Sequence, residues 1–281
     1  MSKINGLASL IDRYDGFVID QWGVLHDGQT PYPGALQALE HLQAAGKPFV
    51  ILSNSGKRAV LNAERMARLG FPDWVGKQLL TSGELTWRAL SNPAEALPAI
   101  AGRRLYLIIQ PGENRLIRDT EWEQVDTVGD ADAVLIAGLT AEATQEEYEP
   151  VLAQALERQL TVLCANPDFD ALLGTKNNVG PGRLAAWYEQ AGGKVIRFGK
   201  PEPDAFTAAR EMLGVDGPAL MIGDSLYHDI AGGSRAGLDT LFITGGIHAS
   251  ALNEPDPGAA LQALYNKVGA VPTHRMQRLV V

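Results

Sequence analysis

The sequence predicts an α/β protein built on a doubly wound parallel sheet. Short apolar runs that end on Asp20, Ser53 and Asp224 alternate with segments of helical apolar spacing. Unbroken apolar runs are typical of strands in parallel sheets, because helices cover both faces of such a sheet. The 281 residues, 46% of them hydrophobic, are enough for about two domains of ordinary globular composition.

The N-terminal part supplies two of these strands. Residues 17–19 form the first, which ends on Asp20. Leucines at positions 36, 39 and 42 predict a helix, which the glycine at position 46 is suited to end. Residues 49–52 form the second strand, and the Ser53-Asn54-Ser55 turn and a helix over residues 57–69 follow it.

The middle part alternates in the same way. Strands are expected over residues 105–109, 133–137 and 160–164, with an acidic stretch at 113–130 and an amphipathic helix around 148–155. The third strand leads into Asn166-Pro167-Asp168, a strong turn former. Residues 173–182 are rich in Gly, Asn and Pro, so a loop and a domain boundary are expected there.

The C-terminal part returns to strands and helices. Strands are expected over residues 195–198, 219–222 and 240–243, with a helix over residues 203–213. Lys200 follows the first of these strands and Asp224 follows the second. Asp229 comes about one helical turn after Asp224.

The composition limits the partners. The net charge of −9, from 33 acidic and 24 basic residues, disfavours a nucleic-acid backbone but leaves small anions open. The single cysteine, Cys164, forms no internal disulfide and fits a reducing compartment. The chain opens on no charged-then-apolar leader and contains no apolar run of membrane-spanning length. We therefore expect a cytoplasmic protein with no membrane partner.

Several polar side chains are expected to meet, because the carboxyl ends of parallel strands share one edge of the sheet. Taken singly, Ser53, Asp224 and Asp229 are open to capping roles, and Asp20 could cap a helix, bind a cation, act as a base or attack phosphorus. Converging carboxylates repel one another unless a cation neutralises them, and an oxygen-only ligand set favours Mg²⁺ over zinc. A metal, the Lys200 ammonium and the Ser53 hydroxyl around Asp20 would make a phosphoryl site.

These motifs resemble those of the haloacid dehalogenase (HAD) superfamily. The resemblance rests on residues 20–25, Leu52-Ser53-Asn54, Gly199-Lys200-Pro201 and Gly223-Asp224-Ser225 with Asp229, in this order along nearly the whole chain. The Asn166-Pro167-Asp168 segment and residues 219–246 are most similar to subfamily IIA, whose members are phosphatases with a C2-type cap. The resemblance implies a Rossmann-like HAD core over residues 1–79 and 183–281 and an inserted α/β cap over residues 80–182.

The resemblance also implies roles for individual residues. Asp20 would be the nucleophile that forms an aspartyl-phosphate, and Lys200 would orient it. Ser53 and Asn54 would hold the phosphoryl group, and Asn166 and Asp168 would add substrate contacts from the cap. Mg²⁺ would be bound by Asp20, by Asp224 and by the main-chain carbonyl of Trp22, with Asp229 in support. The substrate would be a small phosphorylated metabolite, and a homodimer is an open alternative because relatives with this cap include dimers.

Trp22 departs from the family pattern, in which an aspartate at this position protonates the leaving oxygen and later activates water. An indole does neither, and loss of a general acid/base typically slows a reaction by about 10²–10⁴-fold. His26 and Asp27, just beyond the turn, are the candidates to replace it.

Three functional hypotheses follow from this departure. The first is a Mg²⁺-dependent phosphatase that Trp22 has slowed or specialised. The second is a phosphometabolite-binding or regulatory protein with little turnover. The third is other aspartate chemistry, such as carbon–halogen cleavage, against which Asp224 and Asp229 argue because that reaction needs no metal.

Overall fold

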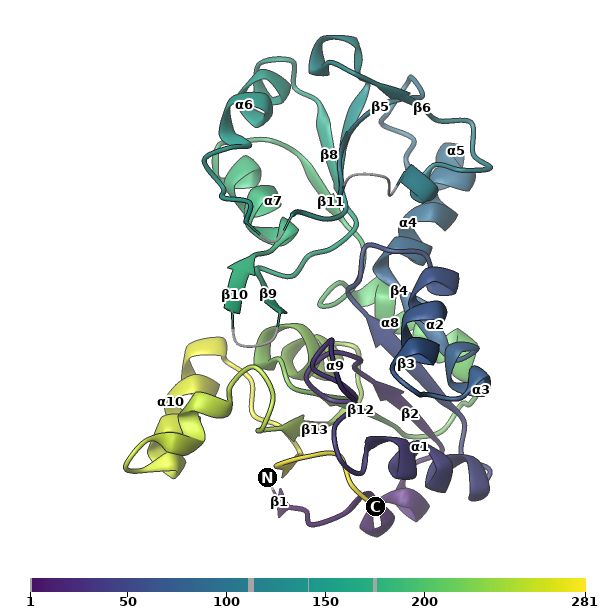
Figure 1. The fold of residues 1–281 in the computed structure, drawn as a ribbon, viewed down its shortest axis with the longest axis vertical. Helices are drawn as coiled ribbons and strands as arrows, with labels where there is room; N and C mark the ends of the chain where they lie inside the picture. The colour runs from purple at the N-terminus through teal and green to yellow at the C-terminus, as the bar shows by residue number, and fades with distance from the viewer. Residues whose placement is uncertain (1, 111–113, 141, 174–175) are drawn as a thin grey trace. The chain divides into compact units, whose positions relative to one another are not determined.

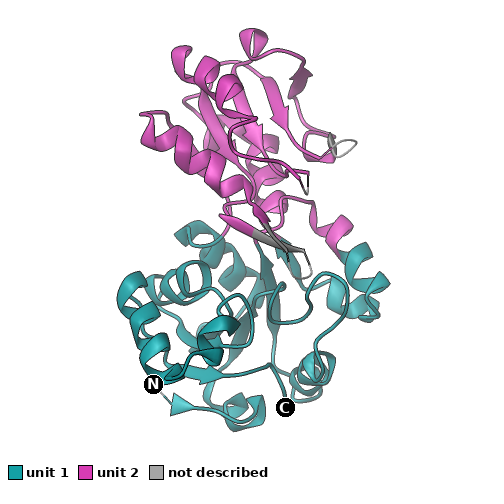
Figure 2. Ribbon diagram, turned by 60° about the vertical axis from the view of Figure 1, so that its left-hand side comes forward, with its two compact units in different colours: residues 1–53, 63–80, 200–281 teal, residues 54–62, 81–199 magenta. Residues whose placement is uncertain are grey.

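The computed structural model describes residues 2–110, 114–140, 142–173 and 176–281, which divide into two compact units (Figures 1 and 2). Unit 1 comprises residues 1–53, 63–80 and 200–281, and unit 2 comprises residues 54–62 and 81–199. Each unit contains its own sheet and its own helices. None of the described helices is both long enough and apolar enough to cross a membrane.

Unit 1 is built on a seven-stranded sheet with strand order β1-β14-β13-β12-β2-β3-β4. The strands are β1 (Ser2–Lys3), β2 (Gly16–Ile19), β3 (Phe49–Ser53), β4 (Leu79–Thr81), β12 (Ala219–Gly223), β13 (Asp239–Ile243) and β14 (His274–Met276). The central strands β3, β2, β12 and β13 pair in parallel. The chain adds β3 and β4 on one side of β2 and later adds β12 on the other side. The order in which strands are added to the sheet therefore reverses between β2 and β12.

The helices of unit 1 flank its sheet in the sequence, and the ends of α8 follow local signals. They are α1 (Ala35–Ala44), α3 (Asp73–Gly76), α8 (Pro203–Leu213), α9 (Gly232–Arg235), α10 (Pro257–Val268), the 3₁₀ turns η1 (Leu7–Ser9), η2 (Ile11–Arg13) and η6 (Ala249–Asn253), and the π-helix η5 (Leu226–Ala231). Helix α2 (Ala59–Arg68) begins in unit 2 and ends in unit 1. Helix α8 opens on a proline and stops at Gly214, whose φ of 66° is the left-handed conformation that glycine favours.

Unit 2 is built on a five-stranded parallel sheet with order β11-β8-β7-β5-β6. The strands are β5 (Arg104–Ile108), β6 (Glu123–Val125), β7 (Ala133–Ile136), β8 (Thr161–Cys164) and β11 (Val195–Arg197), and β9 (Asp170–Leu173) and β10 (Lys176–Val179) form a separate antiparallel pair. The helices are α4 (Ser82–Ser91), α5 (Pro93–Ala96), α6 (Glu149–Glu157), α7 (Pro181–Gln190) and the 3₁₀ turns η3 (Asn114–Leu116) and η4 (Val128–Asp130).

Helices cover both faces of the unit 2 sheet. On one face, Val134 of β7 packs in a cluster with Leu152 of α6 and Leu184 of α7. On the other face, Leu135 of the same strand packs in a cluster with Leu90 of α4. Neighbouring residues of a strand point to opposite faces, so β7 needs apolar side chains at every position.

The structure corrects the expected organisation of the middle part. Strand β11 pairs with β8, so residues 183–199 belong to unit 2 and not to the core domain that the sequence predicts. Residues 173–182, expected to form a loop and a boundary, include β10 and the start of α7, with 174–175 outside the described residues. The acidic stretch 113–130 contains β6, and its residue 113 also lies outside them. Strands β6 and β10 escaped prediction, whereas β11 was expected as a strand. Strand β6 has mostly exposed side chains, so its pairing with β5 leaves no apolar run in the sequence.

Candidate active site

Asp20 follows β2 and Asp224 follows β12, the two parallel strands between which the strand order of the unit 1 sheet reverses. Ile19 at the end of β2 pairs with Ile222 of β12, and the Asp20 N–H donates to the Ile222 carbonyl at 2.8 Å. In open α/β sheets, ligands bind beyond the carboxyl ends of the strands at such a reversal. Both residues are nearly buried, with 8% of Asp20 and 6% of Asp224 exposed.

Asp229 reaches the same place from the π-helix η5. The Ser225 hydroxyl, at the start of η5, accepts the N–H of His228 at 3.1 Å. The Ser225 N–H in turn donates to Oδ2 of Asp229 at 2.9 Å, which fixes the carboxylate. Three carboxylate oxygens lie within 4.8 Å of one another, one each from Asp20, Asp224 and Asp229. A π-helix is rare and occurs often at functional sites.

Lys200 supplies the positive charge of the cluster. Its side chain is 2% exposed, and its Nζ contacts Oδ1 of Asp20 and lies 2.7 Å from Oδ1 of Asp229. Burial alone would lower the pKa of Lys200, but the Asp20 and Asp229 carboxylates outweigh burial and hold that pKa above its ordinary value. The His228 ring contacts the Lys200 carbonyl oxygen through Nδ1 at 3.0 Å and steadies the main chain there.

The cluster carries an excess of negative charge when it is fully ionised. Three carboxylates and one ammonium group leave a formal charge of −2 in a buried place. Burial raises the pKa of Asp20 well above its ordinary value, Lys200 opposes this rise, and Asp229 and Asp224 add to it. A divalent cation would remove the excess charge, and the oxygen-only donor set suits Mg²⁺ or Ca²⁺ and not zinc. The residues present therefore fit a hard divalent metal.

Two glycines allow the main chain to approach Asp224 closely. A Cβ at Gly23, where φ is +78°, would lie 1.8 Å from Oδ2 of Asp224, and a Cβ at Gly246 would lie 2.1 Å from the same oxygen. The Ile247 N–H donates to this oxygen at 2.7 Å. Sequence reasoning missed Gly246 and Ile247. The glycine pair that follows the last core strand was the signal that could have identified them.

The predicted substrate-binding residues fall into two groups. Ser53 is the last residue of β3 and is 1% exposed, at the same edge of the unit 1 sheet as Asp20. Asn54, Asn166 and Asp168 lie in unit 2, where Asp168 contacts each of the other two. The Asn54 side-chain amide donates to Oδ1 of Asp168 at 2.8 Å, and the Asp168 N–H donates to Oδ1 of Asn166 at 3.1 Å.

The Trp22 side chain packs on its own loop. Its ring centroid lies 4.9 Å from that of His26, and the guanidinium carbon of Arg65 lies 5.2 Å from the indole. A Cβ at Gly28 would come within 2.3 Å of the indole, so the main chain runs directly beneath it. The position that carries a carboxylate in the family pattern is therefore filled by a packed aromatic ring.

His26 and Asp27 are both engaged in the same loop. His26 is fully buried, its Nδ1 accepts the Gly28 N–H at 3.0 Å, and burial together with the charge of Arg65 lowers its pKa to about 4. Asp27 accepts the N–H groups of Thr30 and Gln29, which lower its pKa. A neutral, buried imidazole and a firmly ionised carboxylate are poor proton donors near pH 7, which disfavours both as replacements for the missing acid.

Comparison with known proteins agrees with this geometry. Residues 17–123 match a family model described as haloacid dehalogenase-like hydrolase, and residues 197–265 match one described as HAD-hydrolase-like. The acid sugar phosphatase of Staphylococcus aureus (strain USA300) is 24% identical over 242 residues, which cover 84% of this chain and 88% of that protein. The crystal structure of a haloacid dehalogenase-like hydrolase from Brucella suis 1330 superposes with a TM-score of 0.83 at 29% identity, covering 99% of this chain and 100% of the other.

Chronophin of Bos taurus is 31% identical over 252 residues, which cover 86% of this chain and 84% of chronophin. The Brucella structure confirms the predicted α/β fold over 99% of the chain. At this identity and coverage, the chain belongs to the haloacid dehalogenase-like hydrolase family, in its capped subfamily IIA.

Proposed function

We propose that the protein is a Mg²⁺-dependent phosphatase that hydrolyses the phosphate monoester of a small metabolite through an aspartyl-phosphate on Asp20. One observation carries the proposal: Asp20 shares a buried site with Lys200 and two further carboxylates at the reversal of the unit 1 sheet. The acid sugar phosphatase relative supports the reaction class.

In the proposed reaction, Asp20, Lys200 and Ser53 have separate roles. A carboxylate oxygen of Asp20 attacks phosphorus, the bond from phosphorus to the ester oxygen breaks, and the leaving oxygen takes a proton from water and departs as the alcohol. Lys200 holds the other oxygen of Asp20, which orients the carboxylate for attack. The Ser53 hydroxyl donates to a phosphoryl oxygen. Water then cleaves the aspartyl-phosphate and releases inorganic phosphate.

Asp20, Asp224 and the main-chain carbonyl of Trp22 would hold the metal, and Asp229 would support them. Both Asp229 oxygens already have protein contacts, to Lys200 and to Ser225, which suits a supporting role. Bound Mg²⁺ would supply neutralisation of the charge that the carboxylates and the phosphoryl oxygens share.

We further propose that unit 2 is the cap and that Asn54, Asn166 and Asp168 contribute substrate contacts. The hydrogen bonds of Asp168 to Asn54 and Asn166 give a pre-arranged group of amide and carboxylate atoms. A homodimer and a cytoplasmic location stay predictions, and light scattering of the purified protein would measure the first.

The test is phosphate release from a panel of phosphorylated metabolites, with and without Mg²⁺, by the wild type and by Asp20→Asn. We expect metal-dependent release that the substitution abolishes, because the amide cannot act as the nucleophile. Equal release by both proteins would mean a contaminating activity. No release from any substrate, despite Mg²⁺ binding, would overturn the proposal.

Trp22 favours a second candidate, a phosphometabolite-binding protein with little turnover. Its packed indole leaves the expected position of the general acid without a titratable group. Trp22→Asp separates the two candidates, with Trp22→Asn as a matched control of the same shape that cannot exchange a proton. If only the acid is missing, Trp22→Asp raises phosphate release by up to about 10²–10⁴-fold and Trp22→Asn does not. Equal, low release by both variants favours the binding protein.

A further inference from the structure

Arg278 lies at the same edge of the unit 1 sheet as Asp20 and Asp224. Strand β14 pairs in parallel with β13, and the pairing continues beyond both strands, where the Gly245 N–H donates to the Gln277 carbonyl at 2.9 Å. Arg278 therefore follows the carboxyl end of β14, as Asp224 follows that of β12. Only β13 separates these two strands, so their ends lie roughly 10 Å apart.

The main chain on both sides of Arg278 is held in place. The Leu7 N–H donates to the Val280 carbonyl at 2.9 Å. A Cβ at Gly245 would lie 2.5 Å from the Gln277 carbonyl oxygen and 3.1 Å from Nε of Arg278. A side chain at Gly245 would therefore collide with the main chain, and glycine at this position lets the loop after β13 lie directly against the arginine.

The guanidinium of Arg278 lies over an aromatic ring. Its carbon is 4.2 Å from the centroid of the Tyr32 ring, within the range of a cation–π contact. The Tyr32 N–H donates to the Leu25 carbonyl at 2.9 Å, which fixes the loop that follows β2. Burial raises the pKa of Tyr32, and a hydrogen bond with Arg278 opposes this rise. The charges of Asp224 and Asp27 add to the rise, so Tyr32 is near enough to interact with both the arginine and a carboxylate of the site.

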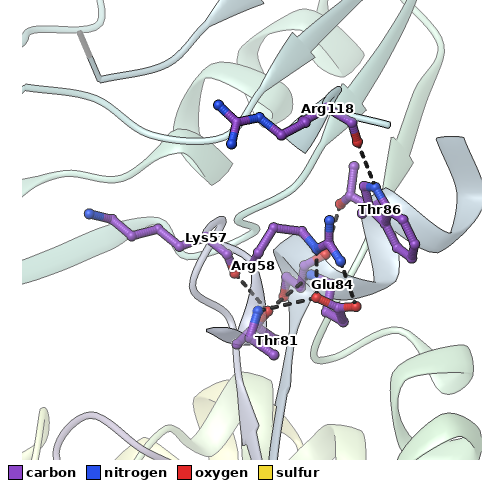
Figure 3. A network of polar contacts seen from close by, with 9 residues as sticks. Lys57, Arg58, Thr81, Glu84, Thr86 and Arg118 are labelled. Carbon is purple, nitrogen blue, oxygen red and sulfur yellow. Dashed lines mark hydrogen bonds and ion pairs between the residues drawn. The ribbon is translucent and has the colours of Figure 1, made fainter. Parts of the chain in front are cut away.

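Arg278 has no carboxylate partner among the described residues. It forms no ion pair with any of them, and its Nη1 is buried without a hydrogen-bond partner there. Arg58 of unit 2 also stacks on a ring, 3.7 Å from the centroid of Trp87, but Glu84 neutralises it through hydrogen bonds of 2.7 and 3.2 Å (Figure 3). A half-buried cation without such a partner is costly, and a bound anion would offset that cost.

We propose that Arg278 determines substrate specificity by binding a second anionic group, carried on the leaving-group side of a short phosphorylated metabolite. The proposal rests on the proposed function, because it takes the reacting phosphoryl group to lie at Asp20 and Ser53. A carboxylate and a further phosphate share the chemistry that the guanidinium fork recognises. The arginine supplies binding and orientation at the far end of the substrate and takes no part in the bond changes at phosphorus.

The test is calorimetric binding to the full-length Asp20→Asn protein with Mg²⁺, because this variant lacks the nucleophile and leaves the ester intact. The probes are glycerol 3-phosphate, 3-phosphoglycerate and glycerol 1,3-bisphosphate. They share a three-carbon chain and differ only in a neutral, carboxylate or phosphate group at the far end. We expect at least one of the two anionic probes to bind about tenfold or more tightly than glycerol 3-phosphate, the effect of one charge-assisted hydrogen bond. The tighter of the two identifies the anion.

Variants made in the same protein assign this preference to one side chain. Arg278→Gln should bring the three affinities to nearly equal values. Arg278→Lys keeps the charge without the fork and should keep part of the preference. Arg275→Gln is the matched control, because it removes the same charge from β14 at a side chain that hydrogen-bonds to Tyr265, and the preference should stay unchanged. Far-UV circular dichroism shows whether each variant is folded.

Four results would overturn the proposal: no binding of any probe, equal affinity for all three, a preference that Arg278→Gln leaves intact, or equal loss of preference in Arg275→Gln. Failure of the proposed reaction is a separate result, because these affinities are measured without turnover. A preference that depends on Arg278, together with no phosphate release by the wild type, would support the role of Arg278 and refute the phosphatase. Phosphate release without any preference would refute only the role of Arg278.

Discussion

Lowering the pH from 8 to 5 is expected to remove about 2 kcal/mol from the free energy of unfolding through His26 alone. The imidazole is fully buried, and its Nε2 has no hydrogen-bond partner among the described residues. Its pKa is about 4 in the folded protein, against 6.5 for an ordinary histidine. Between these values the unfolded chain binds a proton that the folded chain does not. The contribution is therefore complete above pH 6.5, falls as the pH drops towards 4, and totals about 3 kcal/mol.

Urea unfolding of wild type and His26→Asn between pH 8 and 4 measures this effect. Asparagine keeps an acceptor near the Gly28 N–H but does not titrate, so the variant should lose less stability on acidification by about 2 kcal/mol at pH 5. Its stability at pH 8 will be lower because the smaller side chain leaves a cavity beside Trp22. Parallel pH curves for wild type and His26→Asn would refute the reasoning.

Two further predictions concern the carboxylate cluster. Mg²⁺ at one hundred times its dissociation constant should raise the free energy of unfolding by about 2.7 kcal/mol, and Asp224→Asn should abolish this gain. Urea unfolding of both proteins with and without Mg²⁺ measures the effect. An equal gain in the variant would place the metal elsewhere. Lys200→Met should destabilise the metal-free protein by about 3–5 kcal/mol, because it leaves Asp20 and Asp229 buried without their cation. A Lys200→Met protein as stable as the wild type in urea would show that these carboxyls are already neutral.

The strands that carry the Asp20 site could be predicted because each is buried on both faces. The expected strands 17–19 and 219–222 correspond to β2 and β12, which differ from them by one residue at one end. Continuous apolar runs identify such strands, and a polar residue at the carboxyl end marks the edge of the sheet. The proximity of Asp20 and Asp224 then follows from parallel pairing, which requires no knowledge of side-chain positions.

The boundary of unit 2 could not be predicted in this way. Strand β11 resembles a core strand in sequence, and only its pairing with β8 assigns it to unit 2. Strand β6 has mostly exposed side chains and lies in an acidic stretch, so its pairing with β5 leaves no apolar signal. Apolar periodicity reports burial, but strand pairing between distant segments depends on backbone hydrogen bonds that carry little sequence information.

The contacts around the carboxylates show the same limit. Asp229 was expected on an ordinary helical turn, but the wider turn of the π-helix η5 and the Ser225 N–H set its position. The Ile247 N–H reaches Asp224 because a side chain at Gly246 would collide with that carboxylate. Such contacts are decided by the distance between segments that meet only in the folded chain.

Charge balance connects the stability of unit 1 with its chemistry. In a buried site, three carboxylates against one ammonium group oppose folding unless protons or a cation neutralise them. The raised pKa of Asp20 means that its carboxyl takes up a proton more readily than an ordinary aspartate, and a protonated carboxyl is no nucleophile. A cation that competes with this protonation would stabilise the fold and keep the attacking group ionised. Metal affinity should therefore increase with pH over the range in which Asp20 titrates, because the metal and the proton compete for the same carboxylates.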